Sequence, residues 1–164
     1  MSGVPLIPRA ASFGNPSRYQ ARVSPDGQWL TWLAPFEGVL NVWLAPADDI
    51  GAAAPLTRRA GRPIAWQDWA FDGEHIVFIT DENGDENWHL FAVERASAEV
   101  RDLTPIAGVS ARLLMWSPEQ PRTILVGLNE RDKKWHDVWS VDLATGERKL
   151  TLENDQEFWS FTFD

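Results

Sequence analysis

The chain has 164 residues, 44% of them hydrophobic, a formal net charge of −9, ten tryptophans and no cysteine. This is the composition of a globular domain without disulfides or thiolate chemistry, and its negative charge argues against nucleic-acid binding, which needs a basic surface. No stretch approaches 18 uninterrupted apolar residues and the first residues lack a signal-peptide core, so we expect no membrane span and a cytoplasmic location.

Residues 1–18 are rich in proline, glycine, serine and asparagine and are predicted to form an extended N-terminal strap. A first strand-rich unit spans 19–60 and contains the turn Ser24-Pro-Asp-Gly27. In such a turn proline presets φ, aspartate bonds its own backbone and glycine accepts a positive φ. Strands are predicted at 29–33 and 39–45, followed by a fourth strand at Leu56.

The second unit, 61–107, is the most complete copy. Its apolar runs 76–79 and 90–93 flank an acidic turn, and the unit closes with Val100-Arg-Asp-Leu-Thr104. Short apolar runs separated by turn residues predict β-strands.

The third unit, 108–153, has a longer turn at 117–122 and a hairpin at 142–148, whose Thr-Gly suits a tight turn. Residues 154–164 are predicted to start a fourth unit, with the aromatic run Phe158–Phe163 as its first strand.

Equivalent residues recur at a nearly constant interval. Four positions 46 apart are predicted to head the first strand of each unit: Val23, Trp69, Met115 and Phe161. The pairs Leu56-Thr57, Leu103-Thr104 and Leu150-Thr151 recur at 47. A period near 47 built from four strands is typical of β-propeller blades. The sequence therefore predicts an all-β, incomplete β-propeller of three four-stranded antiparallel blades plus the first strand of a fourth.

Three blades do not close a ring, because propellers typically contain 4–8. The open faces and strand edges of such a piece invite association. We therefore expect these residues to be the front part of a longer protein and to self-associate or to keep the remainder of the propeller as a partner.

The acidic turn Asp81-x-Asn83-x-Asp85 has the alternating oxygen donors of a calcium loop. An EF-hand requires glycine at the sixth position and glutamate at the twelfth, where this chain has Glu86 and Ala92. The turn is therefore interpreted as a solvated hairpin connection. No metal and no cofactor is predicted.

The three histidines, His75, His89 and His136, do not have metal-ligand spacing. His89 falls where the first and third units have Asn41 and Asp137, so we expect it to make a polar hydrogen bond at the start of a strand.

None of the serines lies in a strained elbow such as G-x-S-x-G, where a base and an acid would activate it as a nucleophile. Ser24 and Ser117 precede prolines in turns, and Ser110 lacks the second glycine. No catalytic residue is predicted within the chain.

The tryptophans have two interpretations. Trp43 and Trp139 share a repeat position with Phe91, as core residues do, and the core interpretation is favoured. The better candidates for an exposed, sugar-stacking surface lack matched partners: Trp66, Trp88, Trp135 and Trp159.

Three segments together resemble the N-terminal propeller of prolyl oligopeptidase-family serine peptidases, closest to the acylaminoacyl-peptidase and dipeptidyl-peptidase branch. They are Phe13-Gly-Asn-Pro leading to Arg22-Val-Ser-Pro-Asp-Gly-Gln-Trp-Leu, Asp85-Glu-Asn-Trp-His-Leu-Phe-Ala-Val, and Asp142-Leu-Ala-Thr-Gly-Glu. The resemblance covers nearly the whole chain.

The resemblance implies a propeller that covers an α/β-hydrolase domain and restricts entry to short peptides, so that the chain alone is inactive. Some family members hold a substrate amino terminus with propeller glutamates, but Glu82 and Glu86 match no such motif and receive no role. The alternative is a non-enzymatic propeller that binds proteins or ligands, and the coding sequence after Asp164 would separate the two.

Overall fold

The computed structural model describes residues 17–82 and 84–163, so most of the predicted strap lies outside the described residues. Three four-stranded antiparallel sheets confirm the predicted all-β architecture of three blades. Blade 1 contains β1 (Tyr19–Val23), β2 (Trp29–Phe36), β3 (Val39–Pro46) and β4 (Ala54–Pro55), with a short 3₁₀ turn, η1 (Ile50–Ala52), before β4. Blade 2 contains β5 (Trp66–Trp69), β6 (His75–Thr80), β7 (His89–Glu94) and β8 (Val100–Asp102). Blade 3 contains β9 (Ala111–Ser117), β10 (Gln120–Leu128), β11 (Asp137–Asp142) and β12 (Arg148–Leu152).

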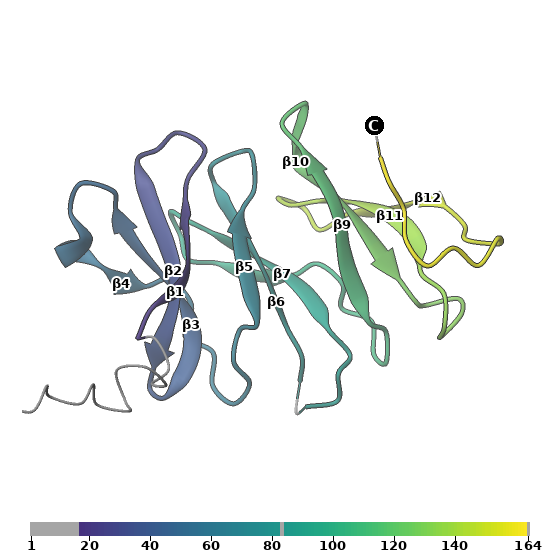
Figure 1. Ribbon diagram of the computed structural model, residues 1–164, viewed down its shortest axis with the longest axis horizontal. Helices are drawn as coiled ribbons and strands as arrows, with labels where there is room; N and C mark the ends of the chain where they lie inside the picture. Colours follow the sequence, from purple (N-terminus) through teal and green to yellow (C-terminus); the bar gives the residue numbers. More distant parts are fainter. Residues whose placement is uncertain (1–16, 83, 164) are drawn as a thin grey trace, which may run out of the picture.

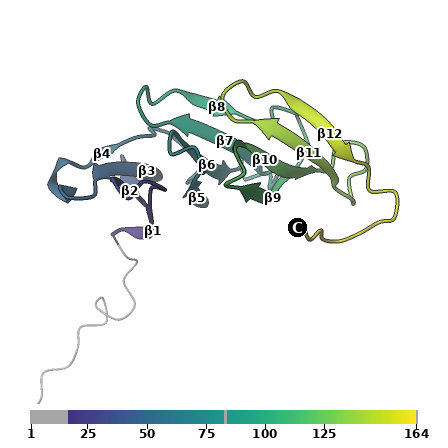
Figure 2. The ribbon, with the colours of Figure 1, turned by 90° about the horizontal axis from the view of Figure 1, so that it is seen from above.

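The blades follow one another in chain order, and within each blade the strands pair in sequence order. Figure 1 shows the three sheets side by side, from the purple first blade to the yellow-green third. In Figure 2 the first strands β1, β5 and β9 lie along one side and the fourth strands β4, β8 and β12 along the other. This is the arrangement of blades around part of an open propeller ring. Within the described ranges, no helix has the length and apolarity to cross a membrane.

The core lies between the blades. One buried cluster joins blades 1 and 2 and includes Leu33, Ile76 and Phe78; a second joins blades 2 and 3 and includes Val77 and Val126. Equivalent positions therefore face the same way, as predicted: Phe78 in β6 and Val126 in β10 both face the preceding blade. Because side chains alternate between the two faces of a strand, the middle blade contributes apolar residues to both clusters.

The turns between the first and second strands of blades 1 and 2 are built as the sequence predicts. Gly27 and Gly73 have φ values of +73° and +68°, the left-handed region that favours glycine. The Asp26 carboxylate accepts a hydrogen bond from the backbone N–H of Gln28 at 3.0 Å, and Asp72 accepts one from that of Glu74 at 2.9 Å. These contacts close each hairpin locally.

Several strand positions and one turn differ from the predictions. Val23 and Trp69 end their strands rather than head them, because the Asp-Gly turn follows within three residues. Met115 lies inside β9 rather than at its start. In blade 3 the turn is short: Gln120 pairs with Ser117, and the next residue of β10 that pairs with β9 is Ile124, opposite Trp116. The additional residues are accommodated as an irregularity within β10, so the facing of Ile124 is preserved.

The predicted first strand of a fourth blade is not paired in the structure. Residues 155–163 form no strand, because a strand is stabilised by pairing and no second strand is present beside this segment. The aromatic side chains instead lie against one another, with the Phe158 and Phe161 ring centroids 6.4 Å apart. Phe158 and Trp159 are 56% and 72% exposed.

Candidate functional site

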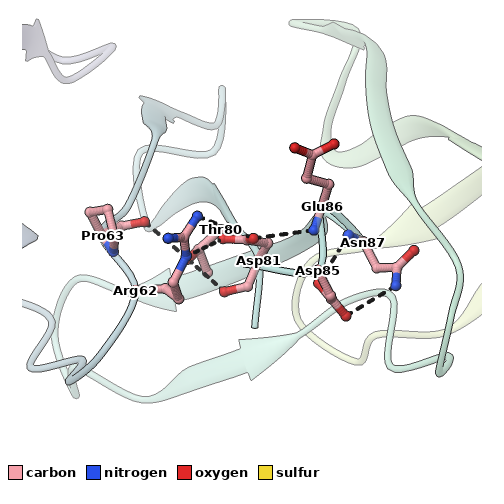
Figure 3. Close-up of polar contacts among 7 residues, drawn as sticks. All are labelled: Arg62, Pro63, Thr80, Asp81, Asp85, Glu86 and Asn87. Atoms are coloured by element: carbon pink, nitrogen blue, oxygen red, sulfur yellow. Dashed lines mark hydrogen bonds and ion pairs between the residues drawn. The ribbon is translucent and has the colours of Figure 1, made fainter. Parts of the chain in front are cut away.

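The acidic turn between β6 and β7 is anchored by an ion pair between a buried aspartate and a half-exposed arginine. The Asp81 side chain is only 1% exposed, and the Arg62 guanidinium donates to its two oxygens at 2.8 and 3.3 Å. The backbone N–H of Glu86 donates to Asp81 Oδ2 at 3.3 Å (Figure 3). The preceding Thr80 hydroxyl donates to the carbonyl oxygen of Pro63 at 3.1 Å, which ties the end of β6 to the entry of blade 2.

The remaining groups of the turn point elsewhere. Asp85 accepts hydrogen bonds from the backbone and side-chain nitrogens of Asn87, both at 3.0 Å, and the Glu86 carboxylate points away from the Arg62–Asp81 pair (Figure 3). Asp81 is thus committed to an arginine and Asp85 to the local backbone. This supports the interpretation as a hairpin connection; Asn83 lies outside the described residues.

The Arg62 guanidinium, with the Glu86 N–H, holds the pKa of the Asp81 carboxyl below its ordinary value of 3.8. Because the folded-state pKa lies below the unfolded one, this carboxylate contributes stability above pH about 4 that is lost as the pH falls through the folded pKa. We expect Asp81→Asn to lower the free energy of unfolding by about 1–2 kcal/mol at pH 7.

The measurement is urea unfolding at pH 7 and pH 3. The difference between the wild type and Asp81→Asn should shrink at pH 3, below the ordinary pKa of 3.8, because protonation of this carboxyl in the unfolded state removes part of the stability that the ionised folded form contributes. The control is Asp85→Asn, which removes an exposed carboxylate from the same turn and should change stability little. An equal difference at both pH values would contradict the prediction.

Two histidines are held by carboxylates within blade 2. His89, the first residue of β7, has its Nδ1 2.8 Å from Asp102 Oδ2, which confirms the predicted polar contact at a strand start. His75 Nδ1 lies 2.6 Å from Asp72 Oδ2, so Asp72 fixes the ring orientation as well as the turn. Asp72, Glu74 and His75 each have an atom that could bind a metal ion, and these atoms lie within 4.8 Å of one another. Histidine-to-histidine spacing missed this cluster; the Asp-x-x-His pattern of a hairpin turn would have found it.

His136 lies in a different environment. It is half-buried against Gly127, where an added Cβ would come within 3.2 Å of the His136 Cβ. Burial, with the nearby Arg112 charge, lowers the pKa of this imidazole below its ordinary value of 6.5. His136 is therefore neutral at physiological pH.

The serines singled out in the sequence are structural. Ser24 Oγ accepts a hydrogen bond from the backbone N–H of Trp29 at 2.9 Å, and Ser117 Oγ accepts one from that of Glu119 at 3.2 Å. Ser110 has its backbone N–H bonded to Asn129 Oδ1 at 2.6 Å. Between residues 17 and 163, apart from residue 83, no serine hydroxyl is hydrogen-bonded to a histidine ring.

A cleft of about 690 Å³ opens between blades 2 and 3, beside the starts of β5 and β9. Its walls include two of the tryptophans for which the sequence offered an exposed role, Trp66 and Trp88, both half-buried. Trp66 is stacked on Trp116, with ring centroids 5.6 Å apart. Trp43 and Trp139 are half-buried beside buried clusters, consistent with the core interpretation.

The chain is similar over its whole length to known peptidases. It is 42% identical over 164 residues to dipeptidyl aminopeptidase BIII of Pseudoxanthomonas mexicana, which covers all of this chain and 24% of that protein. It is 27% identical over 168 residues to dipeptidyl peptidase family member 6 of Caenorhabditis elegans, which covers 98% of this chain and 22% of that protein. The chain thus spans about a quarter of the length of these relatives. No protein-family model matches it.

Solved structures share the fold at low sequence identity. The β-propeller domain of the Trilobed protease from Pyrococcus furiosus aligns with a TM-score of 0.60 at 16% identity, over 84% of this chain and 43% of that chain. Pyrococcus horikoshii acylaminoacyl peptidase aligns with a TM-score of 0.61 at 16% identity, over 85% and 25%. A putative TolB from Agrobacterium tumefaciens aligns with a TM-score of 0.58 at 21% identity, over 84% and 50%. These likenesses establish the propeller architecture.

Proposed function

Because these residues belong to the propeller portion of prolyl oligopeptidase-family serine peptidases, we propose that they help to gate a separate α/β-hydrolase domain that cleaves short peptides. The observation that carries this proposal is the match along the entire chain, at 42% identity, to a dipeptidyl aminopeptidase. A propeller placed over an active site excludes folded chains and bulk water, which makes the site selective for short substrates.

The architecture agrees with this role. The outer face of blade 3 is hollowed over about 580 Å³ and includes Leu125, Leu150 and Phe163, where a following blade would pack. Among the described residues no serine hydroxyl is hydrogen-bonded to a histidine ring, and we propose that the hydrolytic chemistry lies in another part of the protein. The further partners that we propose are the rest of the propeller and the hydrolase domain.

The test compares the full-length protein with the isolated 164-residue chain on chromogenic aminoacyl, dipeptidyl and acyl-peptide substrates. We expect turnover by the full-length protein and none by the chain alone. Turnover by the isolated chain would refute the proposal. A coding sequence that completes a ring without a downstream G-x-S-x-G segment would favour the alternative, a non-enzymatic binding propeller.

Two expectations from the sequence stay predictions. The cytoplasmic location follows only from the features of the first residues. Self-association of the isolated chain follows from its open faces, and the exposure of Phe158, Trp159 and Leu152 supports it, since large exposed apolar side chains favour association.

A further inference from the structure

The cleft between blades 2 and 3 lies where a small side chain replaces a large one found between blades 1 and 2. Between blades 1 and 2, Ile64 donates its backbone N–H to the carbonyl oxygen of Leu40 at 3.0 Å, and its side chain is fully buried. Between blades 2 and 3, Ala111 makes the corresponding hydrogen bond, to the carbonyl oxygen of Trp88 at 2.7 Å. Alanine is three carbons smaller than isoleucine, so the second junction stays open where the first is packed.

The cleft is lined mainly by apolar side chains. Ile79, Leu90 and Leu113 line it together with Trp66 and Trp88. Concave sites that bind small ligands or side chains are typically apolar and aromatic in this way. Arg112 also borders the cleft, but its guanidinium lies over the Trp159 ring, 5.1 Å from the centroid.

Backbone groups beside the cleft fit an extended peptide. β5 and β9 are the first strands of their sheets, and each pairs with only one neighbour, β6 and β10 respectively. No described strand is paired with their other edges, although the Trp69 N–H at the end of β5 is bonded to Asp68 Oδ1 at 2.8 Å. A peptide strand can pair with such an edge while its side chain enters a pocket.

The turn that precedes Trp88 carries exposed carboxylates. Glu82, Asp85 and Glu86 are exposed in the turn that leads into Trp88, and none has an ion-pair partner among residues 17–82 and 84–163. The one buried carboxylate of the turn, Asp81, is already neutralised by Arg62. Arg112 is the one charged residue among the described residues that line the cleft, and its guanidinium lies over Trp159. Exposed carboxylates in the turn next to Trp88 favour a ligand that carries both an apolar side chain and positive charge.

From these observations we propose that the cleft between blades 2 and 3 binds a short extended peptide, with a large apolar side chain between Trp66 and Trp88 and a flanking lysine or arginine beside the acidic turn. This inference rests on the proposed function, in which the protein cleaves short peptides. It adds that the propeller binds one class of these peptides. Ala111 sets the depth of the cleft.

The test is calorimetric binding to the full-length protein after any serine hydrolase activity has been blocked with a fluorophosphonate. The ligands are the N-acetylated, C-amidated tripeptides Lys-Phe-Lys, Lys-Ala-Lys and Glu-Phe-Glu, which lack a free amino terminus. We expect Lys-Phe-Lys to bind about tenfold tighter than either of the others. Equal binding of Lys-Phe-Lys and Glu-Phe-Glu would overturn the proposal.

Ala111→Ile should fill the cleft as Ile64 fills its counterpart and weaken Lys-Phe-Lys binding about tenfold. The matched control, Ala47→Ile, adds the same atoms at an exposed loop position and should bind as the wild type does. Trp88→Leu, which removes one wall, should weaken binding even if Ala111→Ile fails to fold. Unchanged binding in folded Ala111→Ile, or in Trp88→Leu, would also overturn the proposal. Turnover of chromogenic substrates by uninhibited protein would then show that the proposed function stands without the cleft.

Discussion

Phe78→Ala is expected to lower the free energy of unfolding by about 3–5 kcal/mol, the usual cost of removing a buried phenylalanine. Phe78 in β6 is fully buried in the cluster between blades 1 and 2. Its ring stacks on that of its cross-strand partner Phe91, with centroids 5.2 Å apart and planes within 9°. The substitution removes this stacking and leaves a cavity between two blades that have little room to collapse.

The measurement is chemical unfolding followed by tryptophan fluorescence and by circular dichroism. Phe71→Ala is the matched control, because Phe71 lies in the preceding turn and is 40% exposed. We expect the control to cost less than about 1 kcal/mol. Similar losses in the two variants would mean that the interface between the blades does not carry the stability of this part of the chain.

The position of Phe78 was predictable from the repeat. Its equivalents at 46 and 48 residues, Trp32 and Val126, are apolar, and all three face the preceding side of their blades. Strand alternation fixes the facing once the period is known, because a shift by one residue would turn every side chain to the other face. The number and order of the strands in the three blades were predictable for the same reason.

The third Leu-Thr pair shows where the repeat misleads. Thr57 and Thr104 lie just after the fourth strands of their blades, and each hydroxyl oxygen accepts the N–H of a residue in the third strand. Thr151 lies within β12 and is exposed. In blade 3, Asn154 instead donates its backbone N–H to Asp137 Oδ1 at 2.8 Å. The third pair has the same residue types at the same spacing, but it does not have the same place relative to the fourth strand. The reason is that β12 extends further along the chain than β4 or β8.

The pairing within the acidic turn was not predictable from local sequence. Asp81 is neutralised by Arg62, 19 residues earlier, in the segment that enters blade 2. Nothing in the spacing of the acidic residues identifies that arginine. Ile64 and Ala111 are 47 residues apart, so the repeat matches them, and their hydrogen bonds confirm the match. The cleft beside Trp88 was still hidden, because the spacing does not show which side chains fill the junction between two blades. The spacing of equivalent residues predicts the strand arrangement of each blade well. It predicts poorly which side chains contact one another between blades.

The second large effect on stability is expected at Asp137. Its side chain is 5% exposed and accepts hydrogen bonds from Arg131 at 2.9 and 2.7 Å and from the backbone N–H of Asn154 at 2.8 Å. These contacts join the start of β11, the preceding loop and the segment after β12. Asp137→Ala should therefore lower the free energy of unfolding by about 2–3 kcal/mol, because it leaves a buried backbone donor without its acceptor.

The same arginine supplies the matched control for Asp137→Ala. Arg131 also lies 3.3 Å from Asp155, whose side chain is 65% exposed. Asp155→Ala removes a carboxylate from the same guanidinium without exposing a buried donor, and should cost less than about 0.5 kcal/mol. Chemical unfolding of both variants at pH 7 measures the difference. Equal losses would show that the ion pair itself, rather than the buried hydrogen bonds of Asp137, stabilises the outer part of blade 3.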